Sequence, residues 1–169
     1  MNLKEELSWY AVYTKSRMEK KCAELLNERG IAHYLPLQTT IKQWSDRKKK
    51  VTEPFFKSYI FVQINYQTTF LDVLSIYPVV KFVKIGTEIT SIRPQIIEAI
   101  KLSLSCFDEQ ELITIDFKPN EKVKVIAGPL LGNEGIIINK SGNKYFAIHI
   151  EQLGAGIALK LPANHLAPL

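Results

Sequence analysis

Hydrophobic and polar positions alternate with two different periods along the first hundred residues. Short runs rich in β-branched and aromatic residues predict strands, and apolar residues at helical spacing predict helices between them. The predicted strands cover residues 9–14, 31–37, 53–62 and 79–85, and the predicted helices cover residues 16–30, 67–75 and a segment starting at Pro94. This order predicts an α+β sandwich, an antiparallel sheet with helices on one face.

The ends of the predicted helices carry recognisable signals. Ser16 followed by Glu19 fits a capping box at the start of the first helix, and Gly30 fits the left-handed position at its end. Pro94 suits the first turn of the last helix. The first and last helices therefore have predicted limits as well as predicted buried stripes.

The run from Glu53 to Val62 is the most aromatic part of the chain. As a single strand, it would place Phe56, Ser58, Ile60 and Val62 on one face and Phe55, Lys57, Tyr59 and Phe61 on the other. Both faces carry large apolar groups. Either both are buried in the domain or one contacts a partner, and the pattern alone leaves both alternatives open.

The composition changes after Cys106. Residues 107–118 are acidic and predict a linker. Residues 119–169 contain short strands separated by glycine-bearing turns, which predict a small all-β barrel. The predicted organisation is therefore a first domain over residues 1–106, a linker over 107–118 and a barrel over 119–169.

The net charge of +5 is unevenly distributed. Residues 1–106 hold 16 Lys and Arg against 10 Asp and Glu, whereas residues 107–169 hold 6 against 7. The basic first part suits a polyanion, and the second part does not do so by bulk charge. The charge run from Asp46 to Lys50 is either an exposed hairpin tip or a loop that contacts phosphates.

Candidates for catalytic chemistry are few. The two cysteines are far apart with no CxxC, which argues against a disulfide framework or a zinc site and fits a reducing cytoplasm. His33, His149 and His165 stand apart, and there is no P-loop or GxGxxG. No apolar run is long enough to span a membrane, and no secretory signal is visible. We expect a cytoplasmic binding protein with no metal or cofactor, not an enzyme.

The two halves resemble two known modules. Residues 121–135 resemble the KOW motif of SH3-like barrels, including its Gly-Pro turn and Gly135. The resemblance of the first half to the NGN domain is carried by Trp9-Tyr10, Glu19-Lys20-Lys21, Phe55-Phe56 and Tyr59 ahead of Ile60-Phe61-Val62. In this order, over about residues 8–169, the chain resembles the NusG family of transcription elongation factors. Lys57-Ser58 stands where the housekeeping members usually have Pro-Gly, and the run from Val51 to Val62 and the short loops are closer to the specialised RfaH-like members.

The resemblance implies a factor that binds the clamp helices of the largest catalytic subunit of RNA polymerase, suppresses pausing and acts as an antiterminator, as on long operons. The implied polymerase-binding residues are Tyr10, Phe56, Tyr59, Thr68 and Thr69. The implied contacts to nucleic acid, including non-template DNA, are Lys15, Arg17, Lys20, Lys21, Lys48, Lys49 and Lys50. The expected barrel positions for a second partner, either Rho or a small-subunit ribosomal protein, are Leu130, Leu131, Asn133 and Leu153.

Two other functions remain as alternatives at this point. One is an RNA- or ribosome-binding KOW module, and the other is a general NusG that promotes Rho-dependent termination. A basic second half of the chain would favour the first, and residues 107–169 hold 6 Lys and Arg against 7 Asp and Glu. We expect a monomer, and the sequence leaves open whether the barrel masks the polymerase site.

Overall fold

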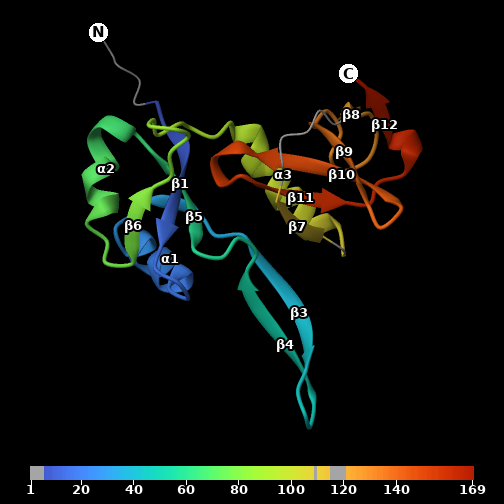
Figure 1. Ribbon diagram of the computed structural model, residues 1–169. Coiled ribbons are helices and arrows are strands. Elements are labelled where there is room, and N and C mark those ends of the chain that lie inside the picture. The colour runs from blue at the N-terminus through green and yellow to red at the C-terminus, as the bar shows by residue number, and fades with distance from the viewer. Residues whose placement is uncertain (1–5, 109, 115–120) are drawn as a thin grey trace. The chain divides into compact units, whose positions relative to one another are not determined.

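The computed structural model describes residues 6–108, 110–114 and 121–169 (Figure 1). The chain divides into two compact units, Met1–Ile92 and Arg93–Leu169. An α+β arrangement in the N-terminal part followed by an all-β sheet confirms the predicted fold class. None of the helices in the described ranges is long and apolar enough to cross a membrane.

Unit 1 is built on a four-stranded antiparallel sheet. Its strands are β1 (Ser8–Thr14), β2 (Ala32–Tyr34), β5 (Tyr59–Ile64) and β6 (Val79–Phe82), in the spatial order β2-β5-β1-β6. Its helices are α1 (Glu19–Glu28) and α2 (Tyr66–Leu74). The strand β1 is central because it pairs with both β5 and β6.

The two helices cover one face of this sheet. Val12 from β1 and Ile60 and Val62 from β5 are fully buried there, together with Leu26 of α1 and Val73 of α2. Each such side chain contributes about 1.5–3 kcal/mol relative to an exposed position. The alternation of β1 and β5 therefore directs this face, which we call the helix-covered face, toward the core of unit 1.

The predicted capping box at Ser16 is wrong. Helix α1 begins at Glu19, its N-cap residue Met18 makes no side-chain capping bond, and Arg17 has a φ of 62°. Glu19 is 4 % exposed, and its carboxylate accepts a hydrogen bond from the backbone N–H of Ser58 at 2.6 Å. Glu19 therefore satisfies a distant buried donor instead of its own helix end.

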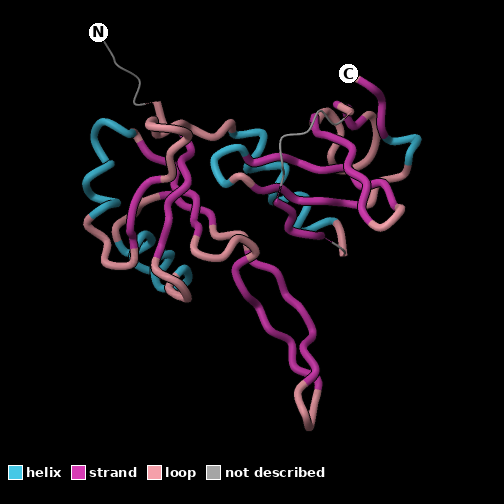
Figure 2. The backbone as a smooth tube through the Cα atoms, in the orientation of Figure 1, coloured by secondary structure: helices cyan, strands magenta, loops and turns pink. Residues whose placement is uncertain are grey.

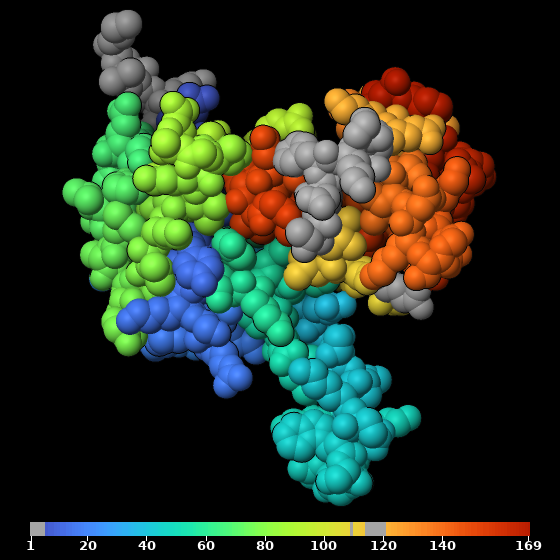
Figure 3. All heavy atoms as spheres, in the orientation of Figure 1, coloured from blue at the N-terminus to red at the C-terminus, as the bar shows by residue number. Residues whose placement is uncertain are grey.

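A long hairpin projects from unit 1 (Figures 1, 2 and 3). It consists of β3 (Leu37–Gln43) and β4 (Lys48–Pro54), paired over their whole length. The expected strand over residues 31–37 is divided at Pro36, since β2 ends at Tyr34 and β3 starts a new sheet. The expected strand over residues 53–62 is likewise divided, because a turn separates β4 from β5.

Unit 2 contains a helix and a six-stranded antiparallel sheet. The helix is α3 (Pro94–Cys106), which has proline in its first turn as predicted. The strands are β7 (Gln110–Thr114), β8 (Lys122–Val125), β9 (Glu134–Lys140), β10 (Asn143–Ile150), β11 (Ala155–Leu159) and β12 (Leu166–Pro168), in the order β12-β8-β9-β10-β11-β7. Two short 3₁₀ turns, η1 (Glu151–Leu153) and η2 (Ala163–His165), lie between the last strands.

The division of the chain differs from the predicted one in two places. Helix α3 groups with unit 2 and not with the first domain. Strand β7 lies within the expected linker and pairs with β11, placing Leu112 opposite Ile157. Its pattern is short, and Leu112 is 47 % exposed, so the sequence signal for a strand is weak. Residues 109 and 115–120 of the expected linker lie outside the described residues.

Gly135 is required by the packing of unit 2. A Cβ atom at this position would lie 2.5 Å from the Ala147 carbonyl oxygen and 2.5 Å from the Phe146 ring, closer than van der Waals contact permits. Phe146 is 1 % exposed and has little room to move. The β9–β10 pairing therefore depends on the missing side chain.

We expect Gly135→Ala to destabilise unit 2 by roughly 1–3 kcal/mol through overpacking. Native-state hydrogen exchange of the β9 and β10 amides measures this loss for unit 2 alone. The exposed Lys144 on β10 offers a control, since Lys144→Ala should leave the exchange unchanged. Equal protection in both variants would contradict the close packing at Gly135.

The bond from Ser58 to Glu19 gives a second expectation. Glu19→Ala removes the acceptor of a buried backbone N–H and should lower the free energy of unfolding by about 1–3 kcal/mol. Glu19→Gln retains a side-chain oxygen and should lose clearly less. Urea unfolding followed by the fluorescence of the buried Trp9 measures both variants. The same loss in both would show that the acceptor oxygen is not what matters.

Candidate functional site

The face of the unit 1 sheet opposite the helix-covered face is lined by aromatic residues. Cross-strand register places Tyr13 opposite Tyr59, Ala11 opposite Phe61, and Phe61 opposite Tyr34. Directly opposite residues share a face, so these five residues lie together with Trp9. We call this set, Trp9, Ala11, Tyr13, Tyr34, Tyr59 and Phe61, the aromatic face.

The aromatic face is buried at its centre and more open toward one end. Phe61 and Ala11 are 0 % and 2 % exposed, and the rings of Tyr34 and Phe61 are stacked with centroids 6.3 Å apart. Tyr13 and Tyr59 are only half-buried, and their rings meet edge to face with centroids 5.4 Å apart. A partner can therefore reach the Tyr13–Tyr59 pair without opening the core.

Tyr13 was missed by sequence reasoning. The available signal was the period of β1, because Tyr13 is four residues from Trp9 and so shares its face. Tyr10, chosen as a neighbour of Tyr59, lies instead on the helix-covered face. Its ring contacts Tyr66 and Phe82, with centroids 5.4 and 6.2 Å away. Tyr10 is half-buried, and this burial raises its pKa.

Phe56 does not present a surface in this structure, which corrects its choice as a docking residue. It is 2 % exposed, and its ring meets the edges or faces of Phe55 and Phe61 at centroid distances of 5.0 and 6.1 Å. The core alternative for this side chain is therefore the one observed. Tyr59 is the member of the Phe56–Tyr59 pair that stays accessible.

The turn between Phe56 and Tyr59 has an unusual backbone. Ser58 has a φ of 66°, a conformation that favours glycine and costs other residues roughly 1–2 kcal/mol. The carbonyl of Ser58 accepts from Thr14 N–H at 2.8 Å, and its own N–H donates to Glu19. These bonds hold the turn beside the ends of β1 and α1, next to the Tyr13–Tyr59 pair.

Thr68 and Thr69 lie elsewhere in unit 1. They belong to α2, which starts after β5 ends at Ile64, whereas Tyr59 begins the same strand. Five residues of strand separate the two places by about 17 Å. Thr69 lines a groove of about 520 Å³ together with Leu7, Arg29, Gly30, Ile31, Ala32, Gln63, Ile64 and Asp72. The structure therefore does not bring the threonines to the tyrosine pair.

The four basic residues near α1 are exposed but differ in their contacts. The Lys15 ammonium lies 4.0 Å from the centroid of the Tyr77 ring, and Tyr77 is 67 % exposed. Lys20 donates to the Thr52 carbonyl at 2.7 Å, while Lys21 pairs with Glu24 at 3.0 Å. The Lys15–Tyr77 contact adds an exposed aromatic ring that follows the end of α2.

Lys48, Lys49 and Lys50 are exposed on β4, near the tip of the hairpin. This confirms that the charge run lies on a hairpin at the surface, and it leaves the phosphate-contact alternative as a prediction. Lys42, on the facing strand, pairs with Glu53 at 2.8 Å. The hydrogen bond from Lys42 lowers the pKa of Glu53.

The chosen barrel residues are not equivalent. Leu130 is 1 % exposed and belongs to the core of unit 2. In this structure it is therefore not available as a contact for a second partner. Leu131 is 64 % exposed, and Leu153 is half-buried in η1. Asn133 turns back on its own loop, since its side-chain amide donates to the Leu130 carbonyl at 3.0 Å.

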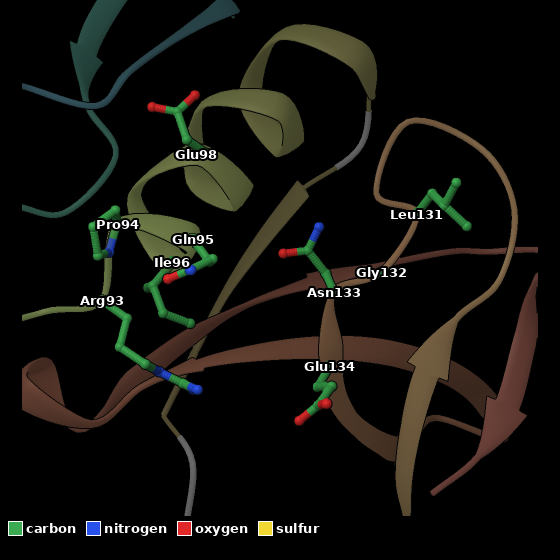
Figure 4. A pocket seen from close by; sticks show the side chains of 9 residues that line it. All are labelled: Arg93, Pro94, Gln95, Ile96, Glu98, Leu131, Gly132, Asn133 and Glu134. Carbon is green, nitrogen blue, oxygen red and sulfur yellow. The ribbon is translucent and has the colours of Figure 1, made fainter.

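A groove of unit 2 runs between the start of α3 and the loop from β8 to β9 (Figure 4). Leu131 and Asn133 line it with Arg93, Pro94, Gln95, Ile96, Glu98, Gly132 and Glu134. Among the residues that the structure describes, no three His, Cys, Asp or Glu side chains come close enough to hold a metal ion. The accessible side chains described above for unit 1 are mainly aromatic and basic.

Comparisons with known proteins agree with this architecture. The fold is similar to a solved structure described as "Domain interaction in Thermotoga maritima NusG", with a TM-score of 0.52 and 22 % identity over 95 % of this chain and 96 % of that one. A structure of an MjSpt4:Spt5 complex matches with a TM-score of 0.34 and 17 % identity, again over 95 % and 96 %. A search of curated proteins finds no match.

The family comparison covers more than half of the chain. Residues 7–101 match the model of the NusG family, described as transcription termination factor nusG. The matched residues include the whole sheet of unit 1, the hairpin and most of α3. The chain therefore belongs to the NusG family of transcription factors.

Proposed function

We propose that this chain is a transcription elongation factor that binds RNA polymerase through the Tyr13–Tyr59 pair and has no enzymatic activity of its own. The observation that carries the proposal is the half-buried, edge-to-face contact of these two rings at the open end of the aromatic face. Membership of the NusG family supports a role in transcription. By resemblance, the partner is the pair of clamp helices of the largest catalytic subunit.

The chemistry of the tyrosine pair suits a protein partner. An aromatic residue in a packed interface often contributes about 2 kcal/mol or more to binding. Tyr13 and Tyr59 are positioned in advance by their strands, so binding orders little additional structure. Their hydroxyl groups give each ring a polar end that tolerates water when no partner is bound.

We also propose that the factor suppresses pausing and acts as an antiterminator of the RfaH-like kind. Lys57-Ser58 in the turn beside the tyrosine pair supports this, because by resemblance the housekeeping members usually have Pro-Gly there. Ser58 keeps the glycine-like φ of 66° while the lysine adds a charge beside the docking surface. Bridging two parts of the polymerase would stabilise its closed, elongating form.

Contacts to nucleic acid complete the proposal. Lys15 and Arg17 lie in the loop between β1 and α1, next to the turn at Ser58, and both are exposed. In the bound factor they would contact phosphates of the non-template strand. Lys20 and Lys21 follow in the first turn of α1, although Lys20 also anchors the hairpin and Lys21 also pairs with Glu24.

Replacing both tyrosines tests the docking surface. Tyr13→Ala with Tyr59→Ala should weaken binding to purified RNA polymerase by at least about thirtyfold, the equivalent of one lost aromatic contact. Fluorescence anisotropy of the labelled factor measures the affinity. Tyr10→Phe is the matched control, because Tyr10 lies on the helix-covered face and the change keeps its ring. Circular dichroism and thermal unfolding establish that the double variant is folded.

A dissociation constant of the double variant within twofold of the wild type would overturn the docking proposal. A ribosome-pelleting assay run alongside distinguishes the competing module. Binding to ribosomes without binding to polymerase would favour a KOW-type RNA-binding protein. Single-round transcription through a terminator, with and without Rho, separates antitermination from support of termination.

Neutralising the basic loop tests the nucleic-acid contact. Binding to a polymerase elongation complex is measured at several salt concentrations. Lys15→Gln with Arg17→Gln should make the slope of log binding constant against log salt concentration shallower by about 0.7 per lost phosphate contact. The control is Lys124→Gln with Lys144→Gln, which removes the same charge from exposed positions of unit 2. The same slope in both pairs would show that only net charge matters.

A further inference from the structure

We propose that the tip of the β3–β4 hairpin binds single-stranded nucleic acid, with an unpaired base stacked on Trp44 and the neighbouring phosphates held by Lys48–Lys50. This inference rests on the nucleic-acid part of the proposed function and names its ligand class. It adds a residue, Trp44, that the polymerase-binding surface does not use. The ligand is recognised by the shared chemistry of DNA and RNA single strands, an accessible base plane and a chain of phosphates.

The register of the hairpin determines which side chains share a face. Lys42 lies opposite Lys49, and Ile41 lies opposite Lys50. By alternation, Trp44 lies on the same face as Lys42 and Lys49. The Lys49 ammonium is 5.6 Å from the centroid of the Trp44 ring, which confirms that the two side chains are neighbours. One face of the tip thus presents an indole plane bordered by cations.

The tip of the hairpin exposes large apolar side chains to an unusual degree. Every residue from 41 to 50 is exposed, with Trp44 at 53 % and Ile41 at 65 %. The space-filling view shows this end of the hairpin standing away from the body of unit 1 (Figure 3). Tryptophan is highly buried on average, so an indole that is 53 % exposed at a hairpin tip is unusual.

The backbone holds the tip in a defined form. The Trp44 N–H donates to the Arg47 carbonyl at 2.8 Å and closes the turn. Farther down the ribbon, Thr39 and Thr52 hydroxyls meet at 2.9 Å, and Lys42 pairs with Glu53. The indole is therefore presented from a paired ribbon and not from an irregular loop, which lowers the ordering cost of binding.

The charge of the hairpin selects a polyanion. Residues 37–54 hold five cations, Lys42, Arg47, Lys48, Lys49 and Lys50, against the two anions Asp46 and Glu53, which gives +3. Arg47 lies 4.0 Å from Asp46, and Lys42 pairs with Glu53. The excess positive charge therefore lies on Lys48–Lys50, of which Lys49 shares the face of the indole and Lys48 and Lys50 lie on the other face of the same strand.

The combination favours single strands over duplex. A basic two-stranded ribbon can enter a major groove, but a duplex offers no free base plane to an indole. Base–aromatic stacking and phosphate contacts together are the usual basis of single-strand binding without sequence preference. The Lys49 ammonium, 5.6 Å from the centroid of the Trp44 ring, is close enough for this flexible side chain to move from the ring to a phosphate when a base stacks there.

The position of the two tryptophans makes the proposal directly measurable. The chain has two, and Trp9 is 9 % exposed whereas Trp44 is 53 % exposed. The full chain is titrated, without polymerase, with mixed-sequence 12-mers of single-stranded DNA and of RNA, with a blunt DNA duplex, and with an abasic 12-mer. Stacking should quench Trp44 fluorescence with the single strands and not with the abasic strand. The DNA and RNA arms identify which strand is preferred.

Substitutions separate stacking from charge. Because these substitutions remove the Trp44 signal, the fluorescence anisotropy of a dye-labelled 12-mer measures the affinity of every variant. Trp44→Ala should weaken single-strand binding about tenfold, and Trp44→Phe should retain most of it, since base–aromatic stacking is sensitive to loss of the ring. Changing Lys48, Lys49 and Lys50 to Gln should lower the log–log salt slope by about 0.7 per lost contact. Tyr59→Ala should bind the strands normally, so failure of the polymerase proposal is distinguishable from failure of this one.

Four results would overturn the inference. They are an affinity of Trp44→Ala within twofold of the wild type, equal binding of the abasic strand, tighter binding of the duplex, and a blue shift of Trp44 with anionic vesicles but not with oligonucleotides. Loss of binding in the triple lysine variant together with unchanged Trp44→Ala would keep the phosphate contact and reject the stacking.

Discussion

The antiparallel pairing of β1 with β5 is the constraint on which the first unit depends. Six residue pairs from Ser8–Ile64 to Tyr13–Tyr59 determine which side chains point to each face. One face receives Val12, Ile60 and Val62 and is closed by helices. The other receives the aromatic residues. A slip of one residue would exchange the two sets and place the aromatic residues under the helices, so register alone separates core from candidate docking surface.

The turn at Ser58 connects that pairing to helix α1. Its φ of 66° carries a conformational cost for serine, and the bonds to Thr14 and Glu19 offset it. The Glu19 carboxylate does this at the expense of its own helix, which has no side-chain cap. Helix α1 thus lacks a side-chain cap because Glu19 bonds to the distant Ser58 instead. This departure lies next to the Tyr13–Tyr59 pair. Local departures of this kind are expected to gather near functional surfaces.

The sequence predicted the order of elements well because hydrophobic period is a local property. It failed where a side chain depends on distant parts of the chain. Phe56 was placed by alternation along one continuous strand, but a turn separates β4 from β5 and breaks the period. Tyr10 was chosen by resemblance to the family, and Tyr13 was overlooked. Cross-strand register shows that Tyr13, and not Tyr10, lies opposite Tyr59. Strand β7 was missed because its stability comes from pairing with β11, and not from its own short pattern.

The low stability of the isolated hairpin limits the affinity of its tip for a single strand. An isolated two-stranded ribbon is marginally stable in water, and this one is held mainly at its base. Phe55 N–H donates to the Pro36 carbonyl at 2.8 Å, and Lys20 donates to the Thr52 carbonyl at 2.7 Å. The tip has no comparable support from the core, so its contacts with a single strand must also order side chains. Such a tip binds weakly by itself. Docking of unit 1 on a polymerase would supply the missing affinity by raising the local concentration of the strand, without a new contact.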